Sequence, residues 1–569
     1  MKSNTTVLAL GVSIGCAALL TACGSDNNDQ ADKLASAPNA ALACSELVGA
    51  QIPASFTPLS TNGATIDRAV LVAADDPANR SGEYCQVHGS IKPVDKTASD
   101  IKVQINLPSQ WNGKSLHYGG GGFHGVLQTA LNHPEGSLLY GEDFLGRGEV
   151  SPAFKNGPPT PLRQGYVTFG SDSGHQASSI WEGSFALNEE ALKNFSVDQL
   201  KKTKDLALHL TQRRYGGQPK QVYFAGGSEG GREALKLVQE YPREYHGVIA
   251  VYPVLNWIPK ALHDNRMVRE LYAASGANWI SPEQNTRINT AVRDACDDLD
   301  GAKDGVVSNI VACAGKEAEI LQSLRCAAGG GSSGCLSEGQ IGVVRAFNTP
   351  RQFDYPLANG FDTMPGYSQL VGADIGILFG ARPVPAIPPT EENDALMGVW
   401  SDQVIRFMIA KDTHLNSLEF DEQAFQPNIL KVSEMLDATK TDISEFKNAG
   451  GKLIIVHGTE DQMVTPYGTI DYFNALKARF GEQALGDFVK FYLVPGFSHG
   501  SGTFYARIET LAALDDWVVQ KKAPQALIAE DQNPENSKRT RPACLWPAYP
   551  HYNNQGDVNA ATSFTCKLP

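Results

Sequence analysis

The apolar residues of this chain change their spacing abruptly near position 226. The stretch "QVYFA" at 221–225 is apolar, aromatic and β-branched, which is typical of a buried strand. The stretch "REALKLVQEY" at 232–241 consists mainly of helix formers, with Ala234, Leu235 and Val238 at helical spacing. The pattern therefore predicts a strand, a short turn and a helix.

The turn between these elements reads Gly-Gly-Ser-Glu-Gly at 226–230. It fits the G-x-S-x-G pattern of a nucleophile elbow, in which a serine occupies a tight turn from strand to helix. Glycines are needed around such a serine because the two backbones approach closely and the turn is strained. A glycine-rich turn with an ordinary serine is the alternative, since matches this short occur by chance. The flanking strand and helix favour Ser228 as a nucleophile.

Two later stretches combine a buried strand with a loop residue capable of acid–base chemistry. The run at 453–456 is apolar and Asp461 follows it, while the run at 488–494 is followed by a turn and His499. Open parallel sheets place site residues at the carboxyl ends of strands, and α/β-hydrolases carry their triad in the order Ser, Asp, His. We predict an α/β-hydrolase fold with Ser228 as nucleophile, His499 as base and Asp461 as the group that orients the base.

Neighbouring residues leave alternatives to this assignment. Glu460 precedes Asp461 and has the same chemistry. His457 lies closer to the strand and is either a second candidate base or a structural histidine. The order and the strand–loop context favour Asp461 and His499.

Four consecutive glycines follow another apolar strand pattern. The stretch "LHYGGGGFHG" at 116–125 comes after "IKVQINLP" at 101–108. Esterases use a glycine-rich loop here to bind the oxyanion, together with the N–H of the residue after the nucleophile. We expect Gly121 or Gly122, and Glu229, to supply these N–H groups. A phosphate-binding loop is the rival, but no Lys-Ser or Lys-Thr pair follows the glycines.

The interval between the elbow helix and the Asp461 strand is too long for a simple connection. We expect residues 256–440 to form an inserted lid domain between two parts of the hydrolase domain, 44–255 and 441–569. Within the lid, "VWSDQVIRFMIAKD" has helical apolar spacing. Its side chains are candidates to stack on an aromatic ring or to pair with a carboxylate, or else belong to the lid core. The substrate-binding candidates are Trp400, Arg406 and Phe407 in the lid and Val464 just beyond Asp461.

Composition and charge narrow the function classes. The chain has 569 residues, of which 42% are hydrophobic, and a formal net charge of -14. This is ordinary for a globular protein, and no basic run is present that would neutralise phosphates. We therefore do not expect nucleic acid as a partner.

The N-terminus has the pattern of an export signal. Lys2 precedes an uncharged apolar stretch, and Leu20 to Cys23 resembles a bacterial lipobox. We expect residues 1–22 to be a cleaved signal peptide, Cys23 to be lipidated and residues 23–43 to be a flexible tether. A permanent transmembrane anchor is the competing interpretation. The expected location is that of a bacterial lipoprotein, in the outer membrane, the periplasm or on the cell surface, with membrane contact only through the lipid.

Eight further cysteines fit an exported protein. No C-x-x-C pair is present, which disfavours zinc. Eight cysteines allow roughly a hundred connectivities, so spacing alone does not fix them. The natural local pairing is Cys44 with Cys85, Cys296 with Cys313, Cys326 with Cys335, and Cys544 with Cys566.

A cluster of acidic residues lies inside the expected lid, in "CDDLDGAKDGVV" at 296–307. Carboxylates this close repel one another unless a cation lies between them, and calcium prefers oxygen ligands. A solvated acidic turn is the alternative. The expected structural Ca²⁺ ligands are the carboxylates of Asp297, Asp300 and Asp304 and the backbone carbonyls of Ala302 and Val306.

Taken together, these stretches resemble the tannase and feruloyl esterase family, which includes mono(2-hydroxyethyl) terephthalate hydrolases. The resemblance runs from about Cys44 to the C-terminus. It rests on the triad segments, the acidic stretch at 296–307, "GYVTFGSDSGHQ" at 165–176 and "GSFAL" at 183–187. It implies a serine esterase whose large lid covers an aromatic acyl pocket, the calcium ligands given above, and the disulfide between Cys296 and Cys313.

One departure from the family pattern concerns the catalytic loops. Many members have cysteines just before the nucleophile and just after the histidine, joined as a disulfide, where this chain has Gly227 and Gly500. We expect hydrolysis of feruloyl, galloyl or terephthalate-type esters through an acyl-enzyme. A general carboxylesterase and a non-catalytic surface binding protein are the alternatives.

Overall fold

The computed structural model describes residues 41–131, 159–327, 334–536 and 538–569. The expected signal peptide, the expected lipidation site Cys23 and most of the expected tether lie outside these residues. Within the described ranges, no helix has the length and apolarity required to cross a membrane.

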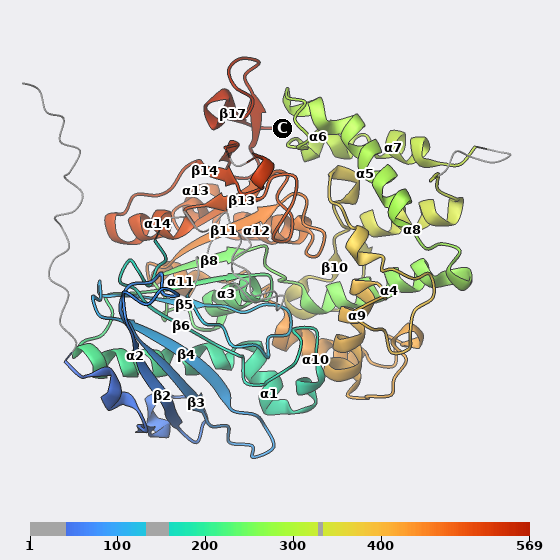
Figure 1. The fold of residues 1–569 in the computed structure, drawn as a ribbon. Helices are drawn as coiled ribbons and strands as arrows, with labels where there is room; N and C mark the ends of the chain where they lie inside the picture. The colour runs from blue at the N-terminus through green and yellow to red at the C-terminus, as the bar shows by residue number, and fades with distance from the viewer. Residues whose placement is uncertain (1–40, 132–158, 328–333, 537) are drawn as a thin grey trace, which may run out of the picture. The chain divides into compact units, whose positions relative to one another are not determined.

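A ten-stranded sheet forms the centre of the hydrolase part (Figure 1). Strands β1 to β4 pair antiparallel, and the strands from β6 onward pair parallel. In spatial order the strands are β1 (Gln51–Ile52), β2 (Ala64–Val72), β3 (Tyr84–Ile91), β4 (Ile101–Pro108), β6 (Val167–Ser171), β5 (Lys114–Tyr118), β7 (Gln221–Gly227), β8 (Gly247–Val251), β11 (Lys452–Gly458) and β12 (Val489–Val494). This is the mixed α/β architecture predicted from the sequence.

The parallel strands are buried along most of their length because both faces of the sheet are covered. Successive residues of β7 show this directly, since Phe224 packs in one cluster with Leu237 of α3, whereas Tyr223 packs with Leu514 of α14 on the other face. The helices of the hydrolase part are α1 (Glu189–Lys193), α2 (Gln199–Tyr215), α3 (Glu229–Glu240), α11 (Ser444–Asn448), α12 (Pro466–Phe480), α13 (Glu482–Gly486) and α14 (Thr510–Asp515).

The described residues of the segment between β8 and β11 contribute no strand to the central sheet. Figure 1 shows its helices in green to orange, gathered beside the sheet. They are α4 (Trp257–Gly276), α5 (Pro282–Cys296), α6 (Ile310–Ala314), α7 (Glu317–Leu324), α8 (Glu338–Asn348), α9 (Leu396–Gln403) and α10 (Gln426–Leu436), with the short strands β9 (Arg351–Gln352) and β10 (Thr363–Met364). The helical spacing in "VWSDQVIRFMIAKD" corresponds to α9, which continues as a π-helical run, Val404–Ala410.

The C-terminal segment adds two small antiparallel sheets beyond β12. Their strands are β13 (Ala506–Ile508), β14 (Leu527–Asp531), β15 (Thr540–Ala543), β16 (Tyr549–Tyr552) and β17 (Phe564–Lys567). β13 follows the loop that contains His499, so this segment anchors the far end of that loop.

Four disulfides join the cysteines in the local pairing expected from the sequence. They link Cys44 with Cys85, Cys296 with Cys313, Cys326 with Cys335, and Cys544 with Cys566. Because these eight thiols are paired, they are not available as zinc ligands. Four disulfides are typical of a protein that folds in an oxidising compartment.

Candidate active site

Ser228 occupies the turn between β7 and α3, as the elbow pattern predicts. Its backbone has φ 57° and ψ −117°, a conformation that a non-glycine residue adopts only when the surroundings impose it. A β-carbon on Gly226 would lie 2.2 Å from the carbonyl oxygen of Gly230, so strand and helix meet this closely only because position 226 is glycine. The turn therefore has the close approach and the strained serine backbone that a nucleophile elbow requires.

Asp461 and His499 come together from the loops after β11 and β12. Nδ1 of His499 lies 2.9 Å from Oδ2 and 3.1 Å from Oδ1 of Asp461, whose side chain is fully buried. Oδ1 also accepts the backbone N–H groups of Met463 and Val464. Burial alone raises the pKa of Asp461, but the facing His499, together with His457, holds it well below its usual range. Asp461 is therefore an ionised group that fixes the orientation of His499.

The two alternatives, His457 in β11 and Glu460 in the loop after it, have partners of their own, although Nε2 of His457 also lies 3.4 Å from Oδ2 of Asp461. His457 is buried, with Nδ1 2.8 Å from Oγ1 of Thr469 and Nε2 2.9 Å from the carbonyl oxygen of Val464. Glu460 accepts the hydroxyl of Thr503 at 2.7 Å. The contact with His499 is made by Asp461, and His457 has the contacts of a structural histidine.

Tyr252, just after β8, connects the serine turn with the histidine loop. The N–H of Ser228 donates to the carbonyl oxygen of Val251 at 3.0 Å, and the carbonyl oxygen of Ser228 accepts the N–H of Val254 at 3.2 Å. Tyr252 lies between these two partners in the chain. The ring of Tyr252 lies 4.5 Å from the ring of His499, centroid to centroid. Ser228 and His499 thus both contact one short segment, residues 251–254, at the carboxyl edge of the sheet. Tyr252 has φ 33°, a backbone state set by its surroundings that no sequence pattern marks.

The glycine-rich loop after β5 lies against the elbow helix. Gly230 donates its N–H to the carbonyl oxygen of Gly120 at 3.0 Å. Among the described residues, no acceptor pairs with the N–H of Gly121 or Gly122. Glu229 is the first residue of α3, where backbone N–H groups lack intrahelical partners. The expected oxyanion donors, Gly121 or Gly122 and Glu229, thus lie on adjoining segments.

The side chain of Glu229 points into a buried polar cluster. Its carboxylate accepts two hydrogen bonds from Arg232, at 2.6 and 2.5 Å, and both side chains have no exposed surface. His124, Glu229 and Glu233 are the one group of three candidate metal ligands, within the described ranges, whose ligand atoms all lie within 4.8 Å of one another. Because Arg232 already occupies both oxygens of Glu229, we interpret this cluster as an ion-pair network rather than a metal site.

The acidic loop after α5 partly fits a hard cation. Asp297 accepts N–H groups from Asp304 and Gly305, and Asp304 pairs with Arg541. Asp300 is buried, and burial raises its pKa to about 6 against the lowering effect of hydrogen bonds from Ser308 and from the N–H of Ala302. Its Oδ2 has no hydrogen-bond partner among the described residues. An orphaned buried carboxylate oxygen is chemically suited to a calcium ion. Arg541 supplies positive charge on the Asp304 side of the loop.

Three of the four substrate-binding candidates lie in one apolar cluster with Phe123, which follows the glycines of the oxyanion loop. The rings of Trp400 and Phe123 are stacked, with 6.1 Å between their centroids, and Phe123 directly follows the glycines. Phe407 and Val464 are buried in the same cluster. Arg406 donates to Asp402 at 2.9 Å and to the carbonyl oxygen of Thr413, so a substrate carboxylate would compete with these partners.

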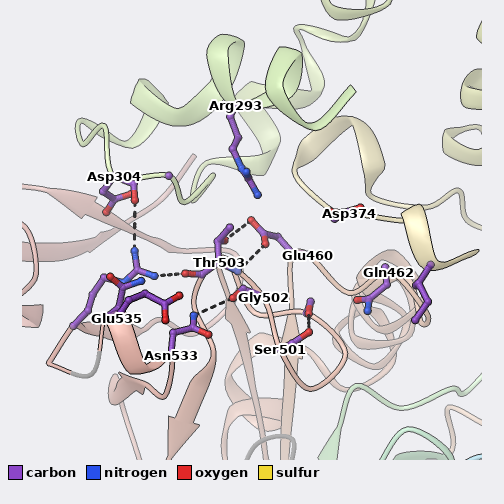
Figure 2. A pocket seen from close by; sticks show the side chains of 15 residues that line it. Arg293, Asp304, Asp374, Glu460, Gln462, Ser501, Gly502, Thr503, Asn533 and Glu535 are labelled. Carbon is purple, nitrogen blue, oxygen red and sulfur yellow. Dashed lines mark hydrogen bonds between the residues drawn. The ribbon is translucent and has the colours of Figure 1, made fainter. Parts of the chain in front are cut away.

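A cavity of about 650 Å³ opens beside the His499 loop (Figure 2). Ser498 and Gln462 line it, and Gln462 accepts the backbone N–H of His499 at 3.1 Å. Figure 2 shows Arg293 pointing from α5 toward Glu460. Burial raises the pKa of Glu460 to about 7, although Thr503 and Arg293 lower it. This cavity is lined mainly by polar groups and so does not provide the aromatic walls expected of an acyl pocket.

Comparisons with known proteins match nearly the whole chain. The model of the family described as tannase and feruloyl esterase matches residues 85–567. An uncharacterized esterase of Agrobacterium fabrum is 39% identical over 535 residues, covering 93% of each chain. The mono(2-hydroxyethyl) terephthalate hydrolase of Piscinibacter sakaiensis is 27% identical, covering 89% of each chain. The crystal structure of feruloyl esterase B from Aspergillus oryzae has the same fold, with a TM-score of 0.72 at 20% identity over 90% of this chain and 98% of that one.

Proposed function

The chain belongs to the tannase and feruloyl esterase family, and from this premise we propose that it hydrolyses esters of aromatic carboxylic acids through an acyl-enzyme on Ser228. The observation that supports this most is the Asp461–His499 hydrogen bond at the sheet edge where β7 ends at Ser228. Feruloyl, galloyl and terephthalate-type acids are the acyl groups that fit the family.

Each residue of the triad has one role in forming and hydrolysing the acyl-enzyme. His499 takes the proton of the Ser228 hydroxyl as its oxygen attacks the ester carbonyl. Asp461, ionised and buried, holds the imidazole and stabilises its positive charge. The N–H groups of Gly121 or Gly122 and Glu229 bind the oxyanion. His499 then protonates the leaving alcohol, and water, activated by the same imidazole, releases the acid.

The preference for aromatic acids is supported by the apolar cluster beside the oxyanion loop. Trp400, Phe407 and Val464 belong to it, and Phe123 connects it to the glycines. An aryl ring attached to the reacting carbonyl would lie next to these side chains, where ring stacking contributes about 0.5–1.5 kcal/mol.

Two further features are part of the proposal. A structural calcium ion is held by Asp297, Asp300 and Asp304 and by the carbonyls of Ala302 and Val306, for which the orphaned Oδ2 of Asp300 is the support. The mature chain is exported and tethered through lipidated Cys23, in keeping with its four disulfides.

A panel of esters tests the substrate class. Methyl esters of ferulic, gallic and terephthalic acids are compared with methyl esters of aliphatic acids of similar size, using the full chain and Ser228→Ala. We expect at least one aromatic ester to have a kcat/KM about tenfold or more above the aliphatic esters, and no turnover by Ser228→Ala. Equal turnover of both classes would indicate a general carboxylesterase. Absence of turnover for every ester would indicate a binding protein.

A further inference from the structure

One residue of the oxyanion loop, Gly120, is held at both its backbone N–H and its backbone carbonyl by residues of the elbow helix. The carbonyl oxygen of Gly120 accepts the backbone N–H of Gly230 at 3.0 Å. The backbone N–H of Gly120 donates to Oε2 of Glu233, also at 3.0 Å. Glu233 lies 113 residues further along the chain and one helical turn after the elbow. The residue after Gly120 is the first expected oxyanion donor, so these two bonds set the position from which Gly121 and Gly122 extend.

The second oxygen of Glu233 is held by a short chain of hydrogen bonds. Nε2 of Gln199, the first residue of α2, donates to Oε1 of Glu233 at 2.6 Å. Oε1 of Gln199 in turn accepts the hydroxyl of Ser171, the last residue of β6, at 2.6 Å. All three side chains are buried. Glu233 is therefore fixed from the sheet and from two helices.

The surroundings of Glu233 favour its neutral form. Burial and the nearby Glu229 raise the pKa of Glu233 to about 8, against the lowering effect of Arg232 and the two hydrogen bonds. His124 lies on the other side, with Nε2 3.4 Å from Oε1 of Glu233. Burial holds the pKa of His124 well below its usual range, so its neutral ring has a free acceptor nitrogen for the acid proton.

His124 also limits how the loop can move. A β-carbon on Gly120 would lie 1.5 Å from Cε1 of His124, so the imidazole rests directly on this glycine. The backbone N–H of His124 donates to the carbonyl oxygen of Gly121 at 2.9 Å. The loop is thus compressed between the His124 ring and α3.

We propose that Glu233 is a positioning residue for ester hydrolysis, which holds the backbone N–H of Gly120 so that the N–H group of Gly121 or Gly122 faces the oxyanion. This rests on the proposed esterase function. Glu233 acts through the loop and does not touch the substrate. A neutral acid suits the role, because a carboxylate directly behind the oxyanion donors would oppose the negative charge that develops in the transition state.

Two substitutions separate positioning from simple structural support. Glu233→Gln is neutral and of the same shape, and its amide oxygen can accept the N–H of Gly120. Glu233→Leu keeps the approximate volume but has no acceptor. Since a displaced oxyanion donor costs about 100-fold, we expect Glu233→Leu to lower kcat by about 30- to 100-fold with KM within about twofold. We expect Glu233→Gln to retain kcat within about fivefold.

The kinetic measurement uses the full chain and the aromatic ester that the wild type hydrolyses fastest, with inhibition by benzeneboronic acid measured in parallel. This boronic acid forms a tetrahedral adduct with a reactive serine, so its inhibition constant should rise along with the loss of kcat. Inhibition by benzoic acid, which imitates the ground state, should not change. If Glu233→Leu does not fold, Glu233→Asp replaces it, because the shorter side chain cannot reach Gly120 and should lose kcat in the same way.

An unchanged kcat in the Leu or Asp variant, or equal losses in the Gln and Leu variants, would overturn the inference. A rise of KM alone would do the same. A wild-type protein that hydrolyses no ester contradicts the proposed function instead, and that result is obtained before any variant is compared.

Discussion

The imidazole of His499 and the carboxylate of Asp461 are 38 residues apart in the chain and are joined at 2.9 Å, at the point where two adjacent parallel strands end. The strands pair in register from Leu453 with Val489 to Gly458 with Val494, so the loops after them leave the sheet side by side. The distance is therefore a consequence of sheet geometry. The adjacent Glu460 carboxylate has a different partner, Thr503.

The first prediction compares these two neighbouring carboxylates. Asp461→Asn keeps the shape but removes the charge and the acceptor that fix the His499 tautomer, so we expect kcat to fall by about 10³- to 10⁴-fold. Glu460→Gln alters a group that bonds Thr503, and its kcat should stay within about tenfold of wild type. Steady-state kinetics on one aromatic ester checks both variants. Equal losses, or a greater loss for Glu460→Gln, would contradict the assignment of Asp461.

The second prediction concerns the buried ion pair beneath the elbow. Arg232 holds Glu229 and also donates to three backbone carbonyls, with no exposed surface. Arg232→Met leaves Glu229 buried without its partner, and we expect a loss of about 3–5 kcal/mol in the free energy of unfolding. The control is Arg243→Met, because the pair of Arg243 with Glu445 is 77% and 67% exposed and should contribute less than about 1 kcal/mol. Urea unfolding followed by fluorescence measures both variants, and similar midpoints for the two would contradict this interpretation.

The third prediction concerns the calcium loop. Chelation with EDTA should lower the melting temperature and added Ca²⁺ should restore it, because an ion at 100-fold excess over its Kd contributes about 2.7 kcal/mol. Asp300→Asn removes the buried carboxylate charge and should lose this response. Asp298 lies in the same loop but is exposed, so Asp298→Asn should keep it. A wild-type melting temperature that changes neither with EDTA nor with added Ca²⁺ would contradict the proposal of a structural calcium ion.

The fourth prediction concerns Trp400. Its indole stacks on Phe123 beside the oxyanion loop, and Nζ of Lys260 lies 4.0 Å from its ring centroid. Trp400→Leu keeps an apolar side chain but loses the stacking surface, so KM for aromatic esters should rise by about two- to tenfold. KM for an aliphatic ester of the same alcohol serves as the internal control and should change by less than twofold. A parallel rise for both esters would indicate that Trp400 only supports the lid core.

The strand–loop elements of the site were predictable because their sequence signal is strong. The strands β7, β11 and β12 are buried on both faces and therefore read as continuous apolar runs, and Ser228, Asp461 and His499 each follow one of them. The four disulfides follow the local order of the cysteines. These features depend on local pattern and on the general geometry of parallel sheets.

Contacts between distant segments could not be read in the same way. Glu233 occupies a polar position on a helix, and nothing in the pattern indicates that α3 is buried on nearly every side or that Gly120 lies opposite. Tyr252 stands at the end of an apolar strand, and its role beside His499 depends on a positive φ. The run of charged residues in "SEGGREAL" was the available hint, since charges in a helix packed against a parallel sheet need buried partners.

The most direct test of the central claim is covalent labelling of the full chain with a fluorophosphonate, measured by intact-protein mass spectrometry with peptide mapping. The reagent reacts with a serine hydroxyl only where a neighbouring base activates it. We expect one adduct, at Ser228, which is absent from Ser228→Ala and forms at least about 10³-fold more slowly in His499→Ala. Wild-type protein that takes up no label, or label that persists in Ser228→Ala, would contradict a serine nucleophile activated by His499.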